Sequence, residues 1–162
     1  PGRYKVSYRD KETWGQNSSA DSEWTEVGPG QPNEIIIVLD NREKERIKVG
    51  EWVPSMMKEE GTEVSWDVSA FIIRDGTYEF EFFYQEGDHG VNIKDVQLLA
   101  NGEVVSSDNH SGWAGYSMRN NTYTLSVSGY APNKQYRLVA YMSTGGGTHS
   151  AGDVNLLRPK EE

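Results

Sequence analysis

Alternating apolar and polar positions run through the second half of the chain and predict an all-β protein. The clearest run is residues 78–85, where four aromatic residues from Tyr78 to Tyr84 occupy every second position and Glu79 and Glu81 lie between them. Side chains alternate between the two faces of a strand, so the aromatic residues share one face. Burial of each aromatic side chain contributes roughly 2–3 kcal/mol, and this alternation should fix the register of the strand.

Similar patterns predict about nine strands in total. Besides residues 78–85, we expect strands at residues 4–9, 34–39, 63–72, 91–100, 103–107, 122–127, 135–143 and 153–158, and residues 24–27 could add a short one. The apolar phase shifts by one between Ile93 and Val96, which indicates a β-bulge near Asp95. Asn101-Gly102 is a strong hairpin signal, because a type I′ turn needs positive φ at both positions. Residues 41–46 are charged, and we expect a turn or a short helix there.

These elements favour one antiparallel β-sandwich of jelly-roll type over residues 1–162, with a long polar loop within the first 47 residues. A chain of 162 residues is about the size of one domain and can bury a core of its own. The first residues, Pro1-Gly2, include no methionine and no signal peptide, so we interpret the sequence as part of a longer protein.

The charge balance narrows the possible partners. The formal net charge is −9, and the acidic residues are spread along the chain. Nucleic acids and anionic membranes attract clustered Lys and Arg, so neither is an expected partner. The chain has no cysteine, which is compatible with a bacterial cytoplasm or periplasm. No apolar run approaches the roughly 20 residues of a membrane span.

The polar segment at residues 108–119 is the best candidate for a binding site. Sugar recognition uses an exposed aromatic face together with polar groups that bond hydroxyls. Trp113, between small neighbours, and Tyr116 are the candidate platforms, and Asp108, His110 and Arg119 are the candidate polar contacts. In the alternative interpretation, Trp113 packs on the edge of the sandwich, while Asp108 and His110 bond the backbone of their own loop.

The other tryptophans divide into two groups. Trp14 and Trp24 flank a polar loop and could form a second ligand platform, or a hydrophobic plug beneath that loop. Trp66 is in phase with the apolar positions of its strand and is expected in the core. Trp52, close to a proline, is expected to serve packing rather than binding.

Metal binding and catalysis have weaker signals. A single structural Ca²⁺ is possible because several aspartates fall at strand ends or in loops. These are Asp75, Asp88, Asp95, Asp108 and Asp153. A zinc site built from His89, His110 and His149 has less support, because no ligand-spacing motif is present. We expect no cofactor and no catalytic residues in this chain, which has no nucleophile elbow, phosphate loop or dinucleotide fingerprint.

Over residues 48–158 the sequence resembles a family of accessory domains. The ordered motifs are GEWVP, EVSWDVSAFI, GTYEFEFFYQEGDHGVNIKDVQLLANG, DNHSGWAG and NNTYTLSV. They are similar to the C-terminal β-sandwich that follows the catalytic domain in bacterial chitobiases and related β-hexosaminidases. The resemblance implies a non-catalytic, galactose-binding-like jelly roll of an exported enzyme, periplasmic or at the cell surface. Residues 1–47 share no such likeness.

Two functions follow from this resemblance. The domain could bind a glycan, such as a chitooligosaccharide or another neutral polysaccharide, through the aromatic loop. It could instead be a structural module that packs against the catalytic domain of the parent chain without a ligand of its own. The family supplies no catalytic or ligand residue that can be placed on this chain, so the candidate residues above rest on their chemistry alone.

Overall fold

The computed structural model describes residues 2–4, 7–9, 19–21, 25–27 and 43–160. By its internal contacts the chain divides into two compact units, Pro1–Asn41 and Arg42–Glu162, whereas we had treated residues 1–162 as one domain. The predicted strand at 34–39 and the residues Trp14 and Trp24 lie outside the described residues. No helix of the described residues is long and apolar enough to cross a membrane.

The described strands of the first unit form two short antiparallel pairs. Strand β1 (Gly2–Tyr4) pairs with β4 (Thr25–Val27), and β2 (Ser7–Arg9) pairs with β3 (Ser19–Asp21). The strand expected at 4–9 is therefore described as two segments with different partners.

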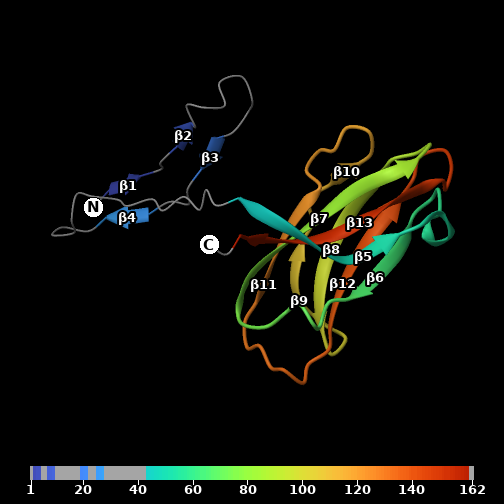
Figure 1. Cartoon of the computed structure of the whole chain (residues 1–162). Coiled ribbons are helices and arrows are strands. Elements are labelled where there is room, and N and C mark those ends of the chain that lie inside the picture. The colour runs from blue at the N-terminus through green and yellow to red at the C-terminus, as the bar shows by residue number, and fades with distance from the viewer. Residues whose placement is uncertain (1, 5–6, 10–18, 22–24, 28–42, 161–162) are drawn as a thin grey trace. The chain divides into compact units, whose positions relative to one another are not determined.

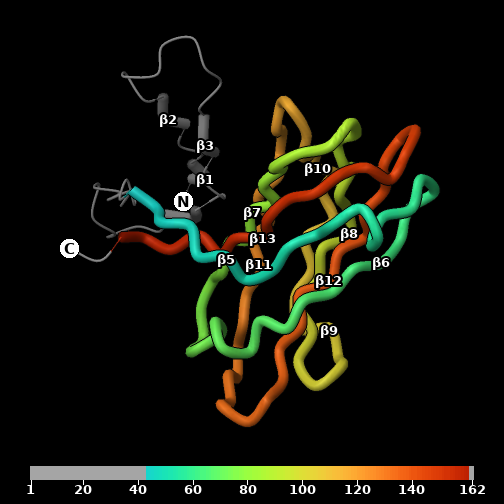
Figure 2. Tube along the Cα trace, turned by 45° about the vertical axis from the view of Figure 1, so that its right-hand side comes forward, coloured from blue at the N-terminus to red at the C-terminus, as the bar shows by residue number. Residues whose placement is uncertain are grey.

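The second unit is an antiparallel β-sandwich (Figure 1). One sheet has the order β10 (Gly112–Ala114), β8 (Val91–Ala100), β12 (Tyr136–Ser143) and β6 (Thr62–Asp67), with β9 (Glu103–Asp108) also paired to β8. The other sheet has the order β11 (Thr122–Val127), β7 (Gly76–Gly87), β13 (Ser150–Pro159) and β5 (Lys44–Trp52). Figure 2 shows β5, β13 and β7 on one side and β6, β12 and β8 on the other. The predicted two-sheet all-β architecture is confirmed.

The inward faces of both sheets form a single apolar core around the aromatic ladder of β7. The four predicted positions from Tyr78 to Tyr84 are all buried. Phe82 is at its centre, with ring centroids 5.7 Å from Trp66, 5.5 Å from Tyr123 and 6.3 Å from Trp52. The pairs with Trp66 and Tyr123 are edge-to-face, and such pairs add about 0.5–1.5 kcal/mol each beyond area burial. Trp66 and Trp52 are therefore packing residues, as predicted.

The predicted irregularities in the strands are also confirmed. Asp95 has φ +51°, and Asp95 and Val96 lie opposite the single residue Ala140, because Lys94 pairs with Tyr141 and Gln97 with Val139. The extra residue returns the apolar side chains to the inner face. Asn101 and Gly102 both have positive φ, 51° and 87°, as the hairpin between β8 and β9 requires.

Two local predictions are wrong. The strand expected at 63–72 ends at Asp67, and residues 69–71 form a turn. Residues 44–46, expected in a turn or short helix, begin the strand β5, where Lys44 pairs with Pro159 and Glu45 with Arg158. The charged side chains lie on exposed backbone and carry no apolar alternation, so only pairing with β13 makes this segment a strand. After β5 the chain turns through a short 3-10 helix, η1 (Pro54–Met56).

Candidate functional site

The strongest candidate site surrounds the turn between β7 and β8, at one end of the sandwich. Gly87 ends β7, and the amides of Asp88 and His89 both donate to the His149 carbonyl in the loop before β13, at 2.9 and 3.2 Å. Figure 1 shows these two connections at the same end of the sandwich. The loop after β10 reaches the same turn from another side through Trp113 and Tyr116.

Tyr116 is highly exposed yet held in place. Its side chain is 88% exposed, while its hydroxyl donates to the Gly87 carbonyl oxygen at 3.1 Å. The ring centroid lies 5.5 Å from that of Tyr84 at an interplanar angle of 60°. An exposed aromatic ring fixed by a hydrogen bond and by an edge contact loses little conformational freedom when a ligand stacks on it.

Tyr84 anchors this arrangement from below. It is buried, and its hydroxyl also donates to the Gly87 carbonyl oxygen. Burial, followed by the Tyr116 hydroxyl and the carboxylates of Asp88 and Glu86, raises the pKa of Tyr84. The phenol therefore stays protonated and continues to donate at any physiological pH.

Trp113 is half-buried and packs on glycine backbone. A Cβ added at Gly90 would lie 2.3 Å from Cζ2 of the indole, and one added at Gly115 would lie 2.7 Å from its Nε1. The small residues beside Trp113 were expected to leave the indole exposed. Gly115 instead gives the indole room to pack against the backbone. Strand β10, which carries Trp113, was not predicted, because three residues paired to Val91–Ile93 leave no periodic signal.

Two histidines complete the end of the sandwich. Nδ1 of His149 lies 2.9 Å from Oδ2 of Asp88, and both side chains are well exposed. The His89 ring rests on the glycine loop before β13, where a Cβ at Gly147 would lie 2.5 Å from its Nε2. We call Trp113, Tyr116, Asp88, His89 and His149 the loop-end site. From the sequence, Asp88, His89 and His149 are expected only as metal candidates, although the glycines around Asp88-His89 and before His149 mark polar turns.

Asp108 and His110 lie away from this site, at the seam between β9 and β11. Oδ1 of Asp108 lies 2.6 Å from Nδ1 of His110, and Oδ2 accepts the Thr124 amide at 2.9 Å. Partial burial acts to raise the pKa of Asp108, but the hydrogen bonds from the Thr124 amide and from His110 hold it below its usual value. Both residues bond the protein itself, as the alternative interpretation supposed.

Arg119 closes the loop through its backbone. Its amide and carbonyl pair with those of Trp113 at 3.0 and 2.8 Å, which forms a bridge at the base of the 114–118 segment. Its side chain is exposed. Of the five predicted residues that the structure describes, it thus brings Trp113 and Tyr116 together on one turn and places Asp108, His110 and Arg119 in supporting positions.

No metal centre assembles among the described residues. They contain no group of three or more His, Asp or Glu side chains positioned to hold an ion. Asp75 accepts the Tyr130 amide at 2.6 Å, and Asp153 accepts from Lys48 at 2.8 Å and from Gln85 at 2.9 Å. These carboxylates serve local structure.

A hollow of about 590 Å³ lies at the other end of β7, away from the loop-end site. It is lined by residues 73–78 and by the end of β13. Here the Arg158 guanidinium donates to the Phe71 carbonyl at 3.0 Å, and the Tyr78 hydroxyl donates to the Arg74 carbonyl at 2.7 Å. These polar groups already have partners, and none of the five predicted binding residues that the structure describes lines this hollow.

Comparison with known proteins does not assign the site. No protein-family model matches the chain, and a search of curated proteins finds no match to it. The resemblance to accessory domains of chitobiases therefore stays a prediction.

Proposed function

We propose that the sandwich is a non-catalytic carbohydrate-binding domain that uses the loop-end site. The observation that carries this proposal is Tyr116, a residue that is 88% exposed although its hydroxyl and ring each have a fixed contact. Exposed aromatic rings on a rigid support are typical of binding surfaces, because they offer a large contact area at low entropic cost. The contacts of Tyr116 with Tyr84 and Gly87 distinguish it from an exposed side chain that rotates freely.

The chemistry of the site favours a sugar. The Tyr116 ring can stack on the C–H face of a pyranose, and the partly exposed indole of Trp113 extends the apolar surface. His89, His149 and Asp88 offer donors and acceptors for hydroxyl groups. With a net charge of −9, the protein repels anionic glycans, so a neutral polysaccharide such as a chitooligosaccharide is the expected ligand.

In this proposal the sandwich is an accessory domain of an exported bacterial glycoside hydrolase and binds substrate beside the catalytic domain of the same chain. Tethering raises the effective concentration of glycan at the catalytic domain without changing the chemical step. The low residue-level specificity of stacking suits such a role, because one aromatic ring can engage many sites along a polymer.

The test is a calorimetric titration of the full chain with a panel of chitooligosaccharides and other neutral glycans. Tyr116→Ala should weaken binding about tenfold or more, since it removes the stacking surface, whereas Tyr116→Phe keeps the ring and should retain most of the affinity. Ser117→Ala, in the same exposed loop, is the matched control. Absence of binding to the whole panel at millimolar sugar, or equal affinity of the alanine variant, would overturn the proposal.

A structural module without a ligand is the second candidate, and one observation favours it. Val104 and Val105 on β9 are 54% and 45% exposed, which leaves apolar surface where a neighbouring domain could pack. Val104→Thr with Val105→Thr should weaken docking to the parent's catalytic domain if this candidate is correct. The same pair should leave glycan affinity unchanged if the loop-end site is the functional one.

A further inference from the structure

His110 is enclosed by acceptors on both sides of its ring. Its Nδ1 lies 2.6 Å from Oδ1 of Asp108, and its Nε2 lies 2.8 Å from the carbonyl oxygen of Asn120. The ring stacks on Tyr123, with centroids 4.2 Å apart and planes 10° from parallel. A carboxylate and a carbonyl can only accept hydrogen bonds, so both contacts are satisfied only when both ring nitrogens carry a proton.

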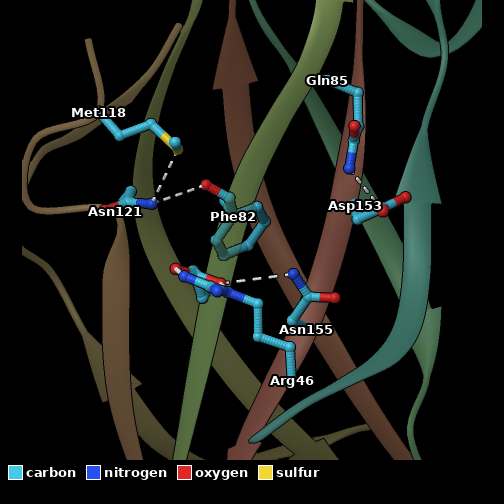
Figure 3. Close-up of polar contacts among 8 residues, drawn as sticks. Arg46, Phe82, Gln85, Met118, Asn121, Asp153 and Asn155 are labelled. Atoms are coloured by element: carbon cyan, nitrogen blue, oxygen red, sulfur yellow. Dashed lines mark hydrogen bonds and ion pairs between the residues drawn. The ribbon is translucent and has the colours of Figure 1, made fainter. Parts of the chain in front are cut away.

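The Asn120 carbonyl is at the base of the loop that carries Tyr116. Asn120 has φ +49°, a left-handed conformation that is uncommon for a residue other than glycine. Its carbonyl oxygen packs directly on Gly112, where an added Cβ would lie only 2.3 Å away. On one side Arg119 pairs with Trp113, and on the other the Asn121 side chain donates to the Phe82 carbonyl at 3.0 Å (Figure 3). The unusual backbone at Asn120 is thus held by its surroundings, His110 among them.

We propose that doubly protonated His110 is a pH-dependent latch, a positioning residue that fastens the 114–121 loop to the end of β9. When the ring loses a proton, one nitrogen presents a lone pair to an acceptor oxygen. The proton stays on Nδ1, because the bond to the Asp108 carboxylate is charge-assisted and the stronger of the two. The contact between Nε2 and the Asn120 carbonyl is then lost, and the loop loosens.

The groups around the ring set the pH range of the latch. Asp108 faces it from β9, and Tyr123 faces it from β11 with a pKa that burial and the Asp108 carboxylate raise, so its phenol stays neutral. Arg119 immediately precedes Asn120 and keeps its charge throughout. The latch is closed where His110 is doubly protonated and Asp108 is ionised, and it opens when the His110 ring becomes neutral.

The consequence for the binding site rests on the proposed function. Tyr116 and the Trp113–Arg119 bridge belong to the loop that the latch holds. A closed latch keeps the Tyr116 ring preorganised, so glycan affinity should be higher in mild acid and should fall at alkaline pH.

Hydrogen exchange tests the latch without any glycan. The amides of Trp113 and Arg119, corrected for intrinsic exchange, should be about tenfold less protected at pH ~8 than at pH ~6, because a hydrogen bond to a charged group is lost. The Leu138 amide of β12 reports on global stability, and its protection sets the baseline. Nitrogen chemical shifts of the His110 ring should show two protonated nitrogens at the lower pH.

Two variants separate the latch from other histidines. His110→Gln should remove the pH dependence of the Trp113 and Arg119 amides, and His149→Gln, with a single exposed Asp88 contact, should retain it. Equal protection of these amides at both pH values in the wild type would overturn the proposal. So would a His110 ring that is neutral while the loop amides remain fully protected. Both outcomes are measured on the wild type, so they do not depend on whether His110→Gln folds. A latch present in a chain that binds no sugar would refute the proposed function and leave this inference standing.

Discussion

Trp113 shows how glycine determines the place of a large side chain. Its indole lies against the backbone of Gly90 in the turn after β7 and against Gly115 in its own loop. In both places any Cβ would overlap the ring, so the absence of a side chain is what the packing requires. Neither glycine has the positive φ that would explain it by backbone conformation.

Gly90→Ala should therefore displace the indole. The added methyl would meet Cζ2 at 2.3 Å, and overpacking of this kind costs about 1–3 kcal/mol. Urea unfolding of the full chain measures the loss, and glycan titration should show weaker binding. Gly145→Ala is the matched control, because an added Cβ there meets nothing within 4 Å. Equal stability of the two variants would show that Trp113 relocates at no cost.

At the scale of the strand, β7 joins two different environments. Its inner face forms the aromatic core, and its outer face carries cross-strand ion pairs to β5. The sequence places Glu79 and Glu81 together on the face opposite the aromatic residues. Glu81 is buried beneath Arg46, which bonds both carboxylate oxygens at 2.6 and 3.0 Å, with Asn155 at 3.4 Å. Figure 3 shows Arg46 and Asn155 side by side on this face.

Glu81→Gln should cost more than Glu79→Gln. The Glu81 side chain is only 10% exposed and has two bonds to Arg46, so loss of its charge should cost about 1–2 kcal/mol, discounted because Arg46 is 58% exposed. Glu79 forms an exposed pair with Lys44, whose loss should cost less than about 0.5 kcal/mol. Chemical denaturation of both variants checks the order, and equal losses would show that burial of the Arg46 pair adds nothing.

The seam between β9 and β11 protects an edge of the sandwich. Strand β11 is the last strand of its sheet, and its outward amides at Thr124 and Ser126 donate to the side chains of Asp108 and Ser106, each at 2.9 Å. Side chains of one sheet thus occupy hydrogen-bonding groups that would otherwise be open to another chain.

Asp108→Asn should lower the free energy of unfolding by about 1–2 kcal/mol at neutral pH. The difference from the wild type should shrink as the pH is lowered. The folded-state pKa of Asp108 is lowered, so its contribution is fully present above the unfolded carboxyl value of about 4 and is lost as pH falls through the folded value. Denaturation of both proteins between pH ~2 and ~7 should show the two curves converging in acid. Asp88→Asn, with an exposed carboxylate, is the control. Curves that stay parallel would contradict this assignment.

Sequence predicts elements well where a strand has one buried face. The boundaries of β11 match residues 122–127, and the bulge at Asp95 follows from the shift in apolar phase. Prediction from sequence fails where only pairing with a distant strand forms the element, as at Lys44–Arg46 and in β10. The jelly-roll detail stays a prediction. The candidate site was half predicted, because contacts such as that of Tyr116 with Gly87, 29 residues away, have no local pattern.

At the scale of the molecule, the described residues of the second unit form a core among themselves. Its buried apolar residues run from Trp52 to Leu156, all within Arg42–Glu162. The same range contains all nine sandwich strands and the whole loop-end site.

Removal of Pro1–Asn41 should therefore leave the sandwich folded. Residues 42–162 should unfold in one cooperative transition, as expected for a single core of this size, with a midpoint within a few degrees of the full chain. Circular dichroism and calorimetry check this, and glycan affinity should be unchanged because Tyr116 and its supports are retained. A shorter fragment, residues 53–162, is the contrasting variant. It lacks β5, the edge strand paired to β13, together with the buried Trp52, and should be less stable. Loss of cooperativity in the 42–162 fragment would show that the first unit stabilises the sandwich through contacts that its core does not reveal.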